Sequence, residues 1–281
     1  MDKQPIGVFD SGLGGLTAVK ELRRLLPNEN IIYFGDTGRV PYGSRSRQTI
    51  TRYAMEDVSL LLSHRVKAVL SACGTVSAVA GELLRSRCPC PYMEVVSPAA
   101  KRACDLSVTG KIGIIATRAT IASGKFQSAI KADCPAAEVT AIPCPLFVPL
   151  VEEGCIAPDN ELLRSAVRLY LTPMRERGVD TLILGCTHYP IIAEAIGEFM
   201  GKNVVLVDSG SEAAKSTSRV LLEQGLLEDD GNAGSCKYFV TDSTENFAGV
   251  ARIFLGGEAE GEVTQVSLEA LEAGVLPENG E

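Results

Sequence analysis

Two cysteines, Cys73 and Cys186, occupy matching positions in the sequence. Each stands just after an apolar, β-branched run, 67–72 in one case and 179–184 in the other. Such runs are typical of the buried strands of a parallel sheet, and the ligands of open α/β sheets bind beyond the carboxyl ends of the strands. The spacing therefore predicts two thiols that face one ligand from opposite sides.

The residues that follow each cysteine strengthen this interpretation. Thr75 lies two positions after Cys73, whereas Thr187 and His188 come directly after Cys186. We expect each cysteine at the N-terminus of a helix, which lowers the pKa of a thiol and favours the reactive thiolate. His188 would in addition orient or acidify Cys186. A lone cysteine after a strand is more often a packed core residue, so the functional interpretation depends on the pair.

A glycine-rich segment, DSGLGGLT at residues 10–17, follows the first predicted strand and opens a helix. It lacks the third glycine of the dinucleotide fingerprint and the lysine of a phosphate loop. Free backbone N–H groups at a helix start still favour an anion such as a carboxylate, which makes Asp10 and Ser11 candidate ligand-binding residues. A helix cap formed by either side chain explains the same spacing equally well.

Three other segments carry weaker signals. The loop at 34–46 offers backbone N–H groups and a phenol, and the proline-rich segment at 145–154 offers an acidic side chain that a solvated turn would also explain. Two threonines begin a helix after the run at 112–116, where helix capping accounts for one of them. His64 stands between a helix and a strand and is interpreted as structural. The candidates from these segments are Pro41, Tyr42, Gly43, Thr117, Thr120 and Glu152.

The composition argues against several classes of function. The chain has 281 residues, with 27 basic against 35 acidic side chains and a net charge of −8, which argues against nucleic acid or an anionic membrane as the main partner. There is no apolar run of about 18 residues and no signal peptide, so we expect a cytoplasmic protein. The nine cysteines are then expected to be reduced. The Cys88-Pro89-Cys90 segment lacks the second pair of a zinc site, so no metal is expected.

Short apolar runs alternate with stretches of helical periodicity along the whole chain. This order predicts the α/β class, with parallel sheets covered by helices on both faces. Prolines in 88–98 and a turn at 208–210 mark predicted crossings between two lobes. The predicted strands are Ile6–Phe9, Ile31–Phe34, Lys67–Ala72, Met93–Val96, Ile112–Ala116, Val139–Ile142, Thr181–Leu184, Val204–Val207, Lys237–Val240 and an edge strand at Val263–Leu268.

The motifs FDSGLGGLT, YFGDTGRVPYG, SACGTVSA, PLFVPLVEEG, LILGCTHYP and LVDSG occur in this order. In these motifs the chain resembles the glutamate racemases of the cofactor-independent aspartate/glutamate racemase superfamily. The resemblance covers about residues 6–210 and implies two similar α/β lobes that face each other across a central cleft. The implied division is 1–97 plus 209–270 for the first lobe, 98–208 for the second, and a frayed tail at 271–281.

The resemblance also implies an activity. It is the interconversion of L- and D-glutamate without a cofactor, which supplies D-glutamate for peptidoglycan and so for cell-wall biogenesis and cell shape. Cys73 and Cys186 would be the two acid/base thiols, assisted by Asp10 and His188, with Glu152 as a further acidic residue near the second thiol. One thiolate would remove the α-proton, and the opposite thiol would return a proton to the other face. The implied substrate-binding residues are Asp10, Ser11, Pro41, Tyr42, Gly43, Gly74, Thr75, Thr117, Thr120, Thr187 and His188.

Gly74 departs from the family pattern, which usually has asparagine between the cysteine and the threonine. The loss of an amide that would bind the substrate predicts a raised KM for glutamate, and it predicts that Gly74→Asn lowers this KM. The competing interpretation is that the backbone conformation requires glycine at this position.

Other functions stay open at this point. They are racemisation of another acidic amino acid such as aspartate, decarboxylation, a binding role for a catalytically weakened racemase fold, and thiol redox chemistry. A decarboxylase of this kind needs only one of the two thiols, so the presence of both favours a racemase. No cofactor is expected. The sequence is compatible with a homodimer but does not decide the oligomeric state.

Overall fold

The computed structural model of the chain describes residues 3–228, 231–245 and 247–274. Its ten strands in these ranges form two sheets in which all neighbouring strands are parallel. The order is β10-β9-β2-β1-β3-β4 in the larger sheet and β6-β5-β7-β8 in the smaller one. The strands are β1 Ile6–Asp10, β2 Ile31–Gly35, β3 Ala68–Ser71, β4 Tyr92–Glu94, β5 Lys111–Ala116, β6 Glu138–Pro143, β7 Thr181–Leu184, β8 Val205–Asp208, β9 Cys236–Val240 and β10 Glu262–Gln265.

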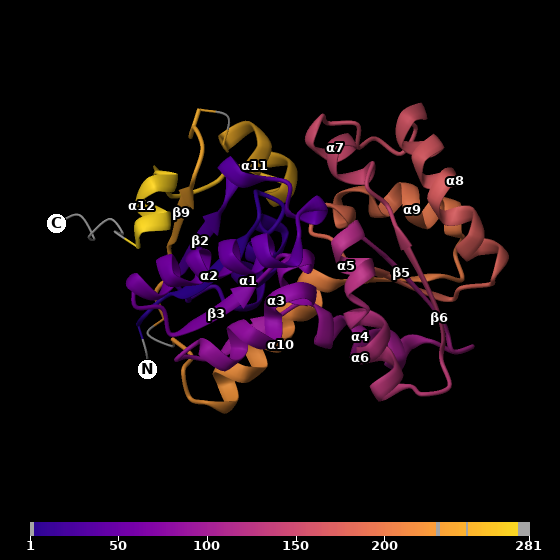
Figure 1. Cartoon of the computed structure of the whole chain (residues 1–281), viewed down its shortest axis with the longest axis horizontal. Coiled ribbons are helices and arrows are strands. Elements are labelled where there is room, and N and C mark those ends of the chain that lie inside the picture. The colour runs from indigo at the N-terminus through magenta and orange to yellow at the C-terminus, as the bar shows by residue number, and fades with distance from the viewer. Residues whose placement is uncertain (1–2, 229–230, 246, 275–281) are drawn as a thin grey trace.

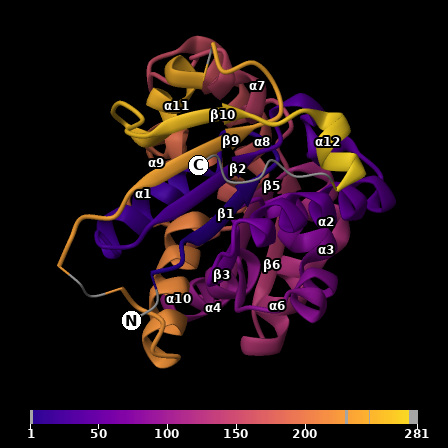
Figure 2. The same cartoon turned by 90° about the vertical axis from the view of Figure 1, so that its left-hand side faces the viewer.

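Helices lie on both faces of each sheet, and Figure 1 shows the two sheets side by side with their helices around them. The turn in Figure 2 brings β10, β9, β2 and β1 into view as neighbouring strands. The α-helices are α1 Leu16–Leu25, α2 Arg47–Ser63, α3 Gly74–Arg87, α4 Val96–Leu106, α5 Arg118–Ser123, α6 Lys125–Asp133, α7 Phe147–Glu152, α8 Glu161–Glu176, α9 Ala193–Met200, α10 Ser209–Glu223, α11 Phe247–Leu255 and α12 Leu268–Ala273, and the 3₁₀ helices are η1 Thr37–Arg39, η2 Tyr42–Ser44 and η3 Tyr189–Ile192.

Alternate side chains of the central strands pack into different parts of the core. On β1, Val8 belongs to the cluster that contains α1, α10 and α11, whereas Phe9 packs with α2 and α3. On β7, Leu182 packs with α7–α9, whereas Ile183 packs with α4 and α6. Successive side chains of a strand point to opposite faces, so strands that are apolar throughout require helices on both sides. The predicted α/β class with two covered parallel sheets is confirmed.

The predicted strands agree with the observed ones within one or two residues, with two informative exceptions. The strand predicted at Met93–Val96 ends at Glu94, because the Glu94 carboxylate accepts hydrogen bonds from the N–H groups of Val96 and Ser97 and so starts α4. The edge strand predicted at Val263–Leu268 ends at Gln265, because Ser267 caps α12. A local hydrogen bond to a carboxylate or hydroxyl overrides the apolar pattern at both places.

The chain passes from the larger to the smaller sheet through α4 and returns through α10. The C-terminal segment then supplies β9 and β10 to the larger sheet. Leu271, which fell in the segment expected to be frayed, is buried in α12, and residues 275–281 of that segment lie outside the described ranges. None of the helices in the described ranges is long and apolar enough to cross a membrane.

Candidate active site

A cavity of about 360 Å³ lies where the carboxyl ends of strands from the two sheets meet. Cys73 and Thr75 reach it after β3, and Cys186 and His188 reach it after β7. The structure thus brings most of the predicted site residues together around one space. Those that line it are Ser11, Pro41, Tyr42, Gly43, Cys73, Gly74, Thr75, Thr117, Glu152, Cys186, Thr187 and His188.

Cys73 is the N-cap residue of α3 and is 4% exposed. Its Sγ donates a hydrogen bond to Ser11 Oγ at 3.6 Å. Burial, followed by the nearby charge of Asp10, raises the pKa of the Cys73 thiol to about 12, although the Val76 N–H at the start of α3 acts in the opposite direction. The helix start therefore lowers this pKa as expected, but desolvation outweighs it, so the expected net fall in the Cys73 pKa was wrong.

Asp10 lies behind the lining residues and is 1% exposed. Its Oδ2 accepts hydrogen bonds from the N–H groups of Gly12 at 3.3 Å and Gly15 at 3.1 Å. Its buried Oδ1 has no hydrogen-bond partner among the described residues. Burial raises the pKa of Asp10, and the charge of His188 partly offsets this rise. The glycine-rich loop therefore directs N–H groups at a carboxylate of its own chain.

Gly14 explains why this loop is rich in glycine. A Cβ atom at Gly14 would lie 2.3 Å from Thr187 Oγ1 and 2.7 Å from His188 Nδ1. The loop after β1 thus touches the residues that follow β7, and Thr17 Oγ1 is 3.4 Å from the carbonyl oxygen of Thr187. Glycine is needed here for close approach between the two halves of the molecule, and this approach brings Asp10 within electrostatic range of His188.

Cys186 lies beside a histidine that a carboxylate holds in place. Cys186 Sγ is 3.9 Å from His188 Nδ1, and His188 Nε2 is 3.1 Å from Glu152 Oε1. Burial lowers the pKa of His188, but the hydrogen bonds with Cys186 and Glu152 outweigh burial and raise this pKa to about 10. The imidazolium form therefore persists at neutral pH next to the Cys186 sulfur.

The prediction that Cys186 stands at the N-terminus of an α-helix was wrong. A turn and the 3₁₀ helix η3, Tyr189–Ile192, follow it, and α9 begins only at Ala193. A positive charge at the sulfur of Cys186 thus comes from His188 and not from a helix terminus.

Three threonine hydroxyls join the two halves of the site. Thr75 Oγ1, at the start of α3, is 3.0 Å from Thr117 Oγ1, which in turn is 2.9 Å from Thr120 Oγ1. Thr117 caps α5 by accepting a hydrogen bond from the Thr120 N–H, as the capping interpretation predicted for one of the two threonines. Thr120 is fully buried and does not line the cavity, so it holds Thr117 in place.

Tyr42 lines the cavity with its ring and backbone but directs its hydroxyl elsewhere. The hydroxyl is hydrogen-bonded to Asp36 and, at 3.1 Å, to Asp57. Arg39 forms ion pairs with both carboxylates, at 2.6 Å and 3.2 Å, and with Glu56. The phenol is therefore not offered to a ligand, contrary to the prediction for this loop. No role was predicted for Asp36 and Arg39 in this loop, and Asp57, which lies on α2, was not predicted either.

Gly74 faces the other half of the cleft at very short range. A Cβ atom there would lie 2.3 Å from the carbonyl oxygen of Gly185 and 3.2 Å from its carbonyl carbon. Gly74 is not among the glycines with positive φ, so space and not backbone conformation requires glycine. An asparagine does not fit at this position in this arrangement of the lobes, which counts against the prediction that Gly74→Asn improves substrate binding.

The sequence analysis missed several residues of the cavity wall. Arg118, the first residue of α5, is the one arginine or lysine among the described residues that line the cavity. The signal available in the sequence was that Arg118 directly follows Thr117, the helix cap at a strand end. Both residues therefore lie at the same edge of the sheet. The other missed lining residues are Gly12, Val40, Ser44, Pro145, Val148, Pro149 and Gly185.

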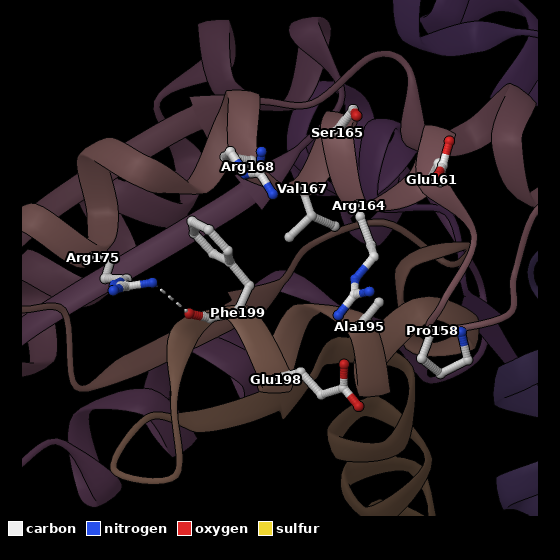
Figure 3. Close-up of a pocket in the computed structure, with 10 residues that line it drawn as sticks. All are labelled: Pro158, Glu161, Arg164, Ser165, Val167, Arg168, Arg175, Ala195, Glu198 and Phe199. Carbon is white, nitrogen blue, oxygen red and sulfur yellow. Dashed lines mark hydrogen bonds between the residues drawn. The ribbon is translucent and has the colours of Figure 1, made fainter.

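A larger hollow of about 510 Å³ lies between α8 and α9, away from these residues. Figure 3 shows it with Arg164, Arg168 and Arg175 on α8 and Phe199 on α9, where the Arg175 side chain reaches the Phe199 carbonyl oxygen at 3.5 Å. No thiol or imidazole is among its described lining residues. Within the described ranges no group of three His, Cys, Asp or Glu side chains is placed to hold a metal ion. The smaller cavity with both thiols is therefore the candidate active site.

Comparisons with known proteins identify the family of this chain. The model of the family Asp/Glu/Hydantoin racemase matches residues 16–217. A glutamate racemase of Geobacter metallireducens is 47% identical over 96% of this chain and 99% of its own length, and one of Neisseria meningitidis serogroup A is 46% identical over 95% and 97%. The structure of Francisella tularensis glutamate racemase in complex with D-glutamate superimposes with a TM-score of 0.89 at 38% identity, covering 96% of this chain and 100% of that one. The chain therefore belongs to the Asp/Glu/Hydantoin racemase family.

Proposed function

We propose that this protein is a glutamate racemase that interconverts L- and D-glutamate without a cofactor, with Cys73 and Cys186 as its two acid/base groups. The observation that carries the proposal is that both thiols line one cavity from opposite lobes, in opposite electrostatic surroundings. The similarity to glutamate racemases over nearly the whole chain supports the choice of substrate.

The two thiols are prepared for different roles before the substrate arrives. The His188 imidazolium stabilises negative charge on the Cys186 sulfur, so Cys186 acts as the base. The raised pKa of about 12 keeps Cys73 protonated, so Cys73 acts as the acid. In one direction the Cys186 thiolate removes the α-proton, and the Cys73 thiol delivers its proton to the opposite face of the same carbon. The roles are exchanged in the reverse direction.

Negative charge that develops on the substrate needs donors directed at its carboxylate groups. The hydroxyls of Ser11, Thr75, Thr117 and Thr187 line the cavity, and Arg118 adds a positive charge at its wall. An acidic amino acid carries two carboxylates, so the positive charges of Arg118 and His188 favour it over a neutral one. Glu152 does not oppose this, because its carboxylate interacts with His188.

We also propose the biological role and the domain division that the family resemblance implies. D-glutamate made here would supply peptidoglycan synthesis. The first lobe would comprise 1–97 plus the segment from 209, and the second lobe 98–208. The pairing of β9 with β2 supports this division, and the contact of α12 with α2 extends the first lobe to the end of the described chain. A racemase for aspartate is not favoured, since the similar relatives named above are glutamate racemases.

Incubation of the purified protein with L- or D-glutamate in D2O tests the proposal directly. We expect the circular dichroism signal of either enantiomer to decay to zero, with deuterium incorporated at the α-carbon in both products and without added cofactor. Parallel reactions with L- and D-aspartate separate the two acidic substrates. Absence of α-proton exchange with either enantiomer of glutamate would overturn the proposal.

A further inference from the structure

A second pair of thiols lies outside the candidate active site. Cys88 ends α3 as its C-cap residue, and Cys90 follows after Pro89. The two Sγ atoms are 3.5 Å apart. We propose that Cys88 and Cys90 form a redox-active dithiol, which low-molecular-weight disulfides oxidise to an intramolecular disulfide before any other cysteine of the chain reacts.

Geometry favours this reaction at Cys88 and Cys90. The sulfur atoms are already in contact, and forming a bond of about 2.05 Å requires them to approach by only about 1.5 Å. Both side chains are partly exposed, and Pro89 between them is exposed, so a small disulfide can reach the pair. The loop between α3 and β4 carries the pair at the end of a helix, where a side-chain movement does not disturb a strand.

The protonation state of the pair also favours the reaction at Cys88 and Cys90. A hydrogen bond from the Cys90 thiol to the Cys88 sulfur lowers the pKa of Cys88 to about 7, and the pKa of Cys90 is raised in return. Cys88 therefore carries more thiolate at neutral pH than an ordinary cysteine, and the thiolate is the nucleophile in thiol–disulfide exchange.

Four of the seven other cysteines are less accessible, whereas Cys104, Cys134 and Cys155 are partly exposed like the pair. Cys73, Cys144, Cys186 and Cys236 are buried. Cys104 is the strongest competitor because it interacts with Cys134, but burial, followed by that interaction, raises the pKa of Cys104 to about 12. Its sulfur also donates a hydrogen bond to the Ile130 carbonyl oxygen at 3.7 Å.

The reaction is balanced by exchange with the small disulfide. The Cys88 thiolate attacks one sulfur of the disulfide, and the other half leaves as a thiolate that takes up a proton. Cys90 then loses its proton and attacks the Cys88 sulfur of the mixed disulfide, which releases the second small thiol. The protein loses two protons and two electrons, and the small disulfide takes them up and is reduced to two thiols.

The dithiol and the catalytic thiol Cys73 lie at opposite ends of α3. This helix has 14 residues and a length of about 21 Å. A disulfide at Cys88 and Cys90 therefore leaves the cavity unblocked, and we expect oxidised protein to retain racemase activity within about twofold. The pair would react with small disulfides first, while Cys73 and Cys186 stay reduced.

Oxidation of the full chain by glutathione disulfide at pH 7.5 tests this inference. After an acid quench and alkylation of free thiols, peptide mapping by mass spectrometry locates the modified cysteines. We expect loss of two hydrogens in the peptide that contains Cys88 and Cys90, at least about tenfold faster than any change at Cys73 or Cys104, and full reversal by dithiothreitol.

Two variants and one matched control test the order of the steps. Cys90→Ser is expected to accumulate a stable glutathione adduct at Cys88, whereas Cys88→Ser gains neither the adduct nor the disulfide, and Cys104→Ser behaves like the parent. Thermal melts check that each variant is folded, and the parent protein gives the peptide map without any substitution. A first disulfide at Cys104 and Cys134, or an unmodified Cys88–Cys90 peptide in the parent, would overturn the proposal.

Discussion

The two thiols of the cleft follow strands in similar sequence contexts, yet their surroundings are opposite. Cys73 is the N-cap residue of α3 but lies next to the carboxyl group of Asp10, and burial together with this charge raises the pKa of Cys73 to about 12. No α-helix begins at Cys186, but His188 lies next to it, and the pKa of His188 is raised to about 10. Packing has therefore placed two similar sequence motifs in opposite electrostatic surroundings.

This difference concerns the resting state and has a mechanistic consequence. A two-base racemase needs one protonated and one deprotonated group at the start of each turnover. Under the proposed function, the proton starts on Cys73, whose pKa is raised, and the His188 imidazolium stabilises the thiolate of Cys186. The reverse direction must begin from the less favoured arrangement, so the two directions are predicted to respond differently to changes at His188.

The largest expected effect is the loss of either thiol. Cys73→Ser and Cys186→Ser should each reduce racemisation by at least about 10³-fold, because a serine hydroxyl is far too weak an acid to exchange roles with a thiol. Each variant should still eliminate HX from one enantiomer of a substrate analogue with a leaving group, since elimination needs one base. Initial rates with both enantiomers measure this.

Cys144→Ser is the matched control for the two thiols, because Cys144 is buried near Cys186 but does not line the cavity. It should racemise glutamate at the parent rate. If Cys73→Ser or Cys186→Ser racemises within about tenfold of the parent, a difference of about 1.4 kcal/mol in barrier, the two-base assignment is wrong.

The second effect concerns closure of the cleft at Gly74. Gly74→Ala places a methyl group 2.3 Å from the Gly185 carbonyl oxygen, so the lobes must separate and the two thiols move apart. We expect kcat/KM to fall by about 10- to 100-fold, which corresponds to about 1.4–2.8 kcal/mol. Steady-state kinetics and a thermal melt distinguish lost closure from lost folding.

Gly81→Ala is the control for that change, because Gly81 lies on the same helix and a Cβ atom there meets nothing within 4 Å. It should keep the parent activity and gain about 0.5–1 kcal/mol of stability from the better helix propensity. Parent-like kinetics for Gly74→Ala would show that contact with Gly185 does not control catalysis.

The third effect differs between the two directions of racemisation. His188→Asn should slow the direction that begins with proton abstraction by Cys186 by about tenfold, and the other direction less, because only one of them needs the imidazolium at the start. The Haldane relation requires compensating changes in KM. Separate initial rates from L- and D-glutamate measure the asymmetry, and equal losses in both kcat values would instead assign His188 a shared role in binding or structure.

His188 should also make stability depend on pH. Its pKa rises from 6.5 to about 10 on folding, so the folded state binds the proton more tightly than the unfolded state. This contribution is fully present below pH 6.5 and is lost as pH rises from 6.5 through about 10. Urea unfolding of the parent and His188→Asn at several pH values should show a difference that shrinks over this range, and a constant difference would contradict the raised pKa.

The smallest effect is expected at Glu152. Its side chain is 49% exposed, so solvent screens its interaction with His188. Glu152→Gln should reduce kcat by a few-fold at most and shift the alkaline limb of the pH–rate profile to lower pH, because His188 loses part of its support. Glu153→Gln, which replaces the neighbouring exposed carboxylate, is the control and should leave the pH–rate profile unchanged.

Much of the fold could be predicted from local patterns. Apolar runs such as Thr181–Leu184 became buried strands, and Thr117 capped its helix as expected. The predicted strand boundaries were wrong where a polar side chain accepts a hydrogen bond from a backbone N–H group, as Glu94 and Ser267 do. Both cysteines were expected at one ligand site because the ligands of open α/β sheets bind beyond the carboxyl ends of the strands, and in the structure these ends of the two sheets meet at one cavity.

Other parts of the site could not be predicted because they depend on contacts between distant segments. The Tyr42 hydroxyl is held by Asp36 and Asp57, so the phenol is directed away from the ligand. The glycine requirement at Gly74 comes from Gly185, a residue of the other lobe. Neither contact can be predicted from the spacing of neighbouring residues in the sequence.

The sequence by itself determined the alternation of strands and helices and the presence of two thiols at strand ends, since both follow from local apolar periodicity and turn residues. Only the tertiary structure decided that the Asp10 carboxylate lies beside Cys73 and that Glu152 pairs with the histidine next to Cys186. The pKa of a buried group depends on its desolvation and on charges within a few ångströms. Beside burial, the Cys73 pKa responds to Asp10, and the His188 pKa responds to Cys186 and Glu152.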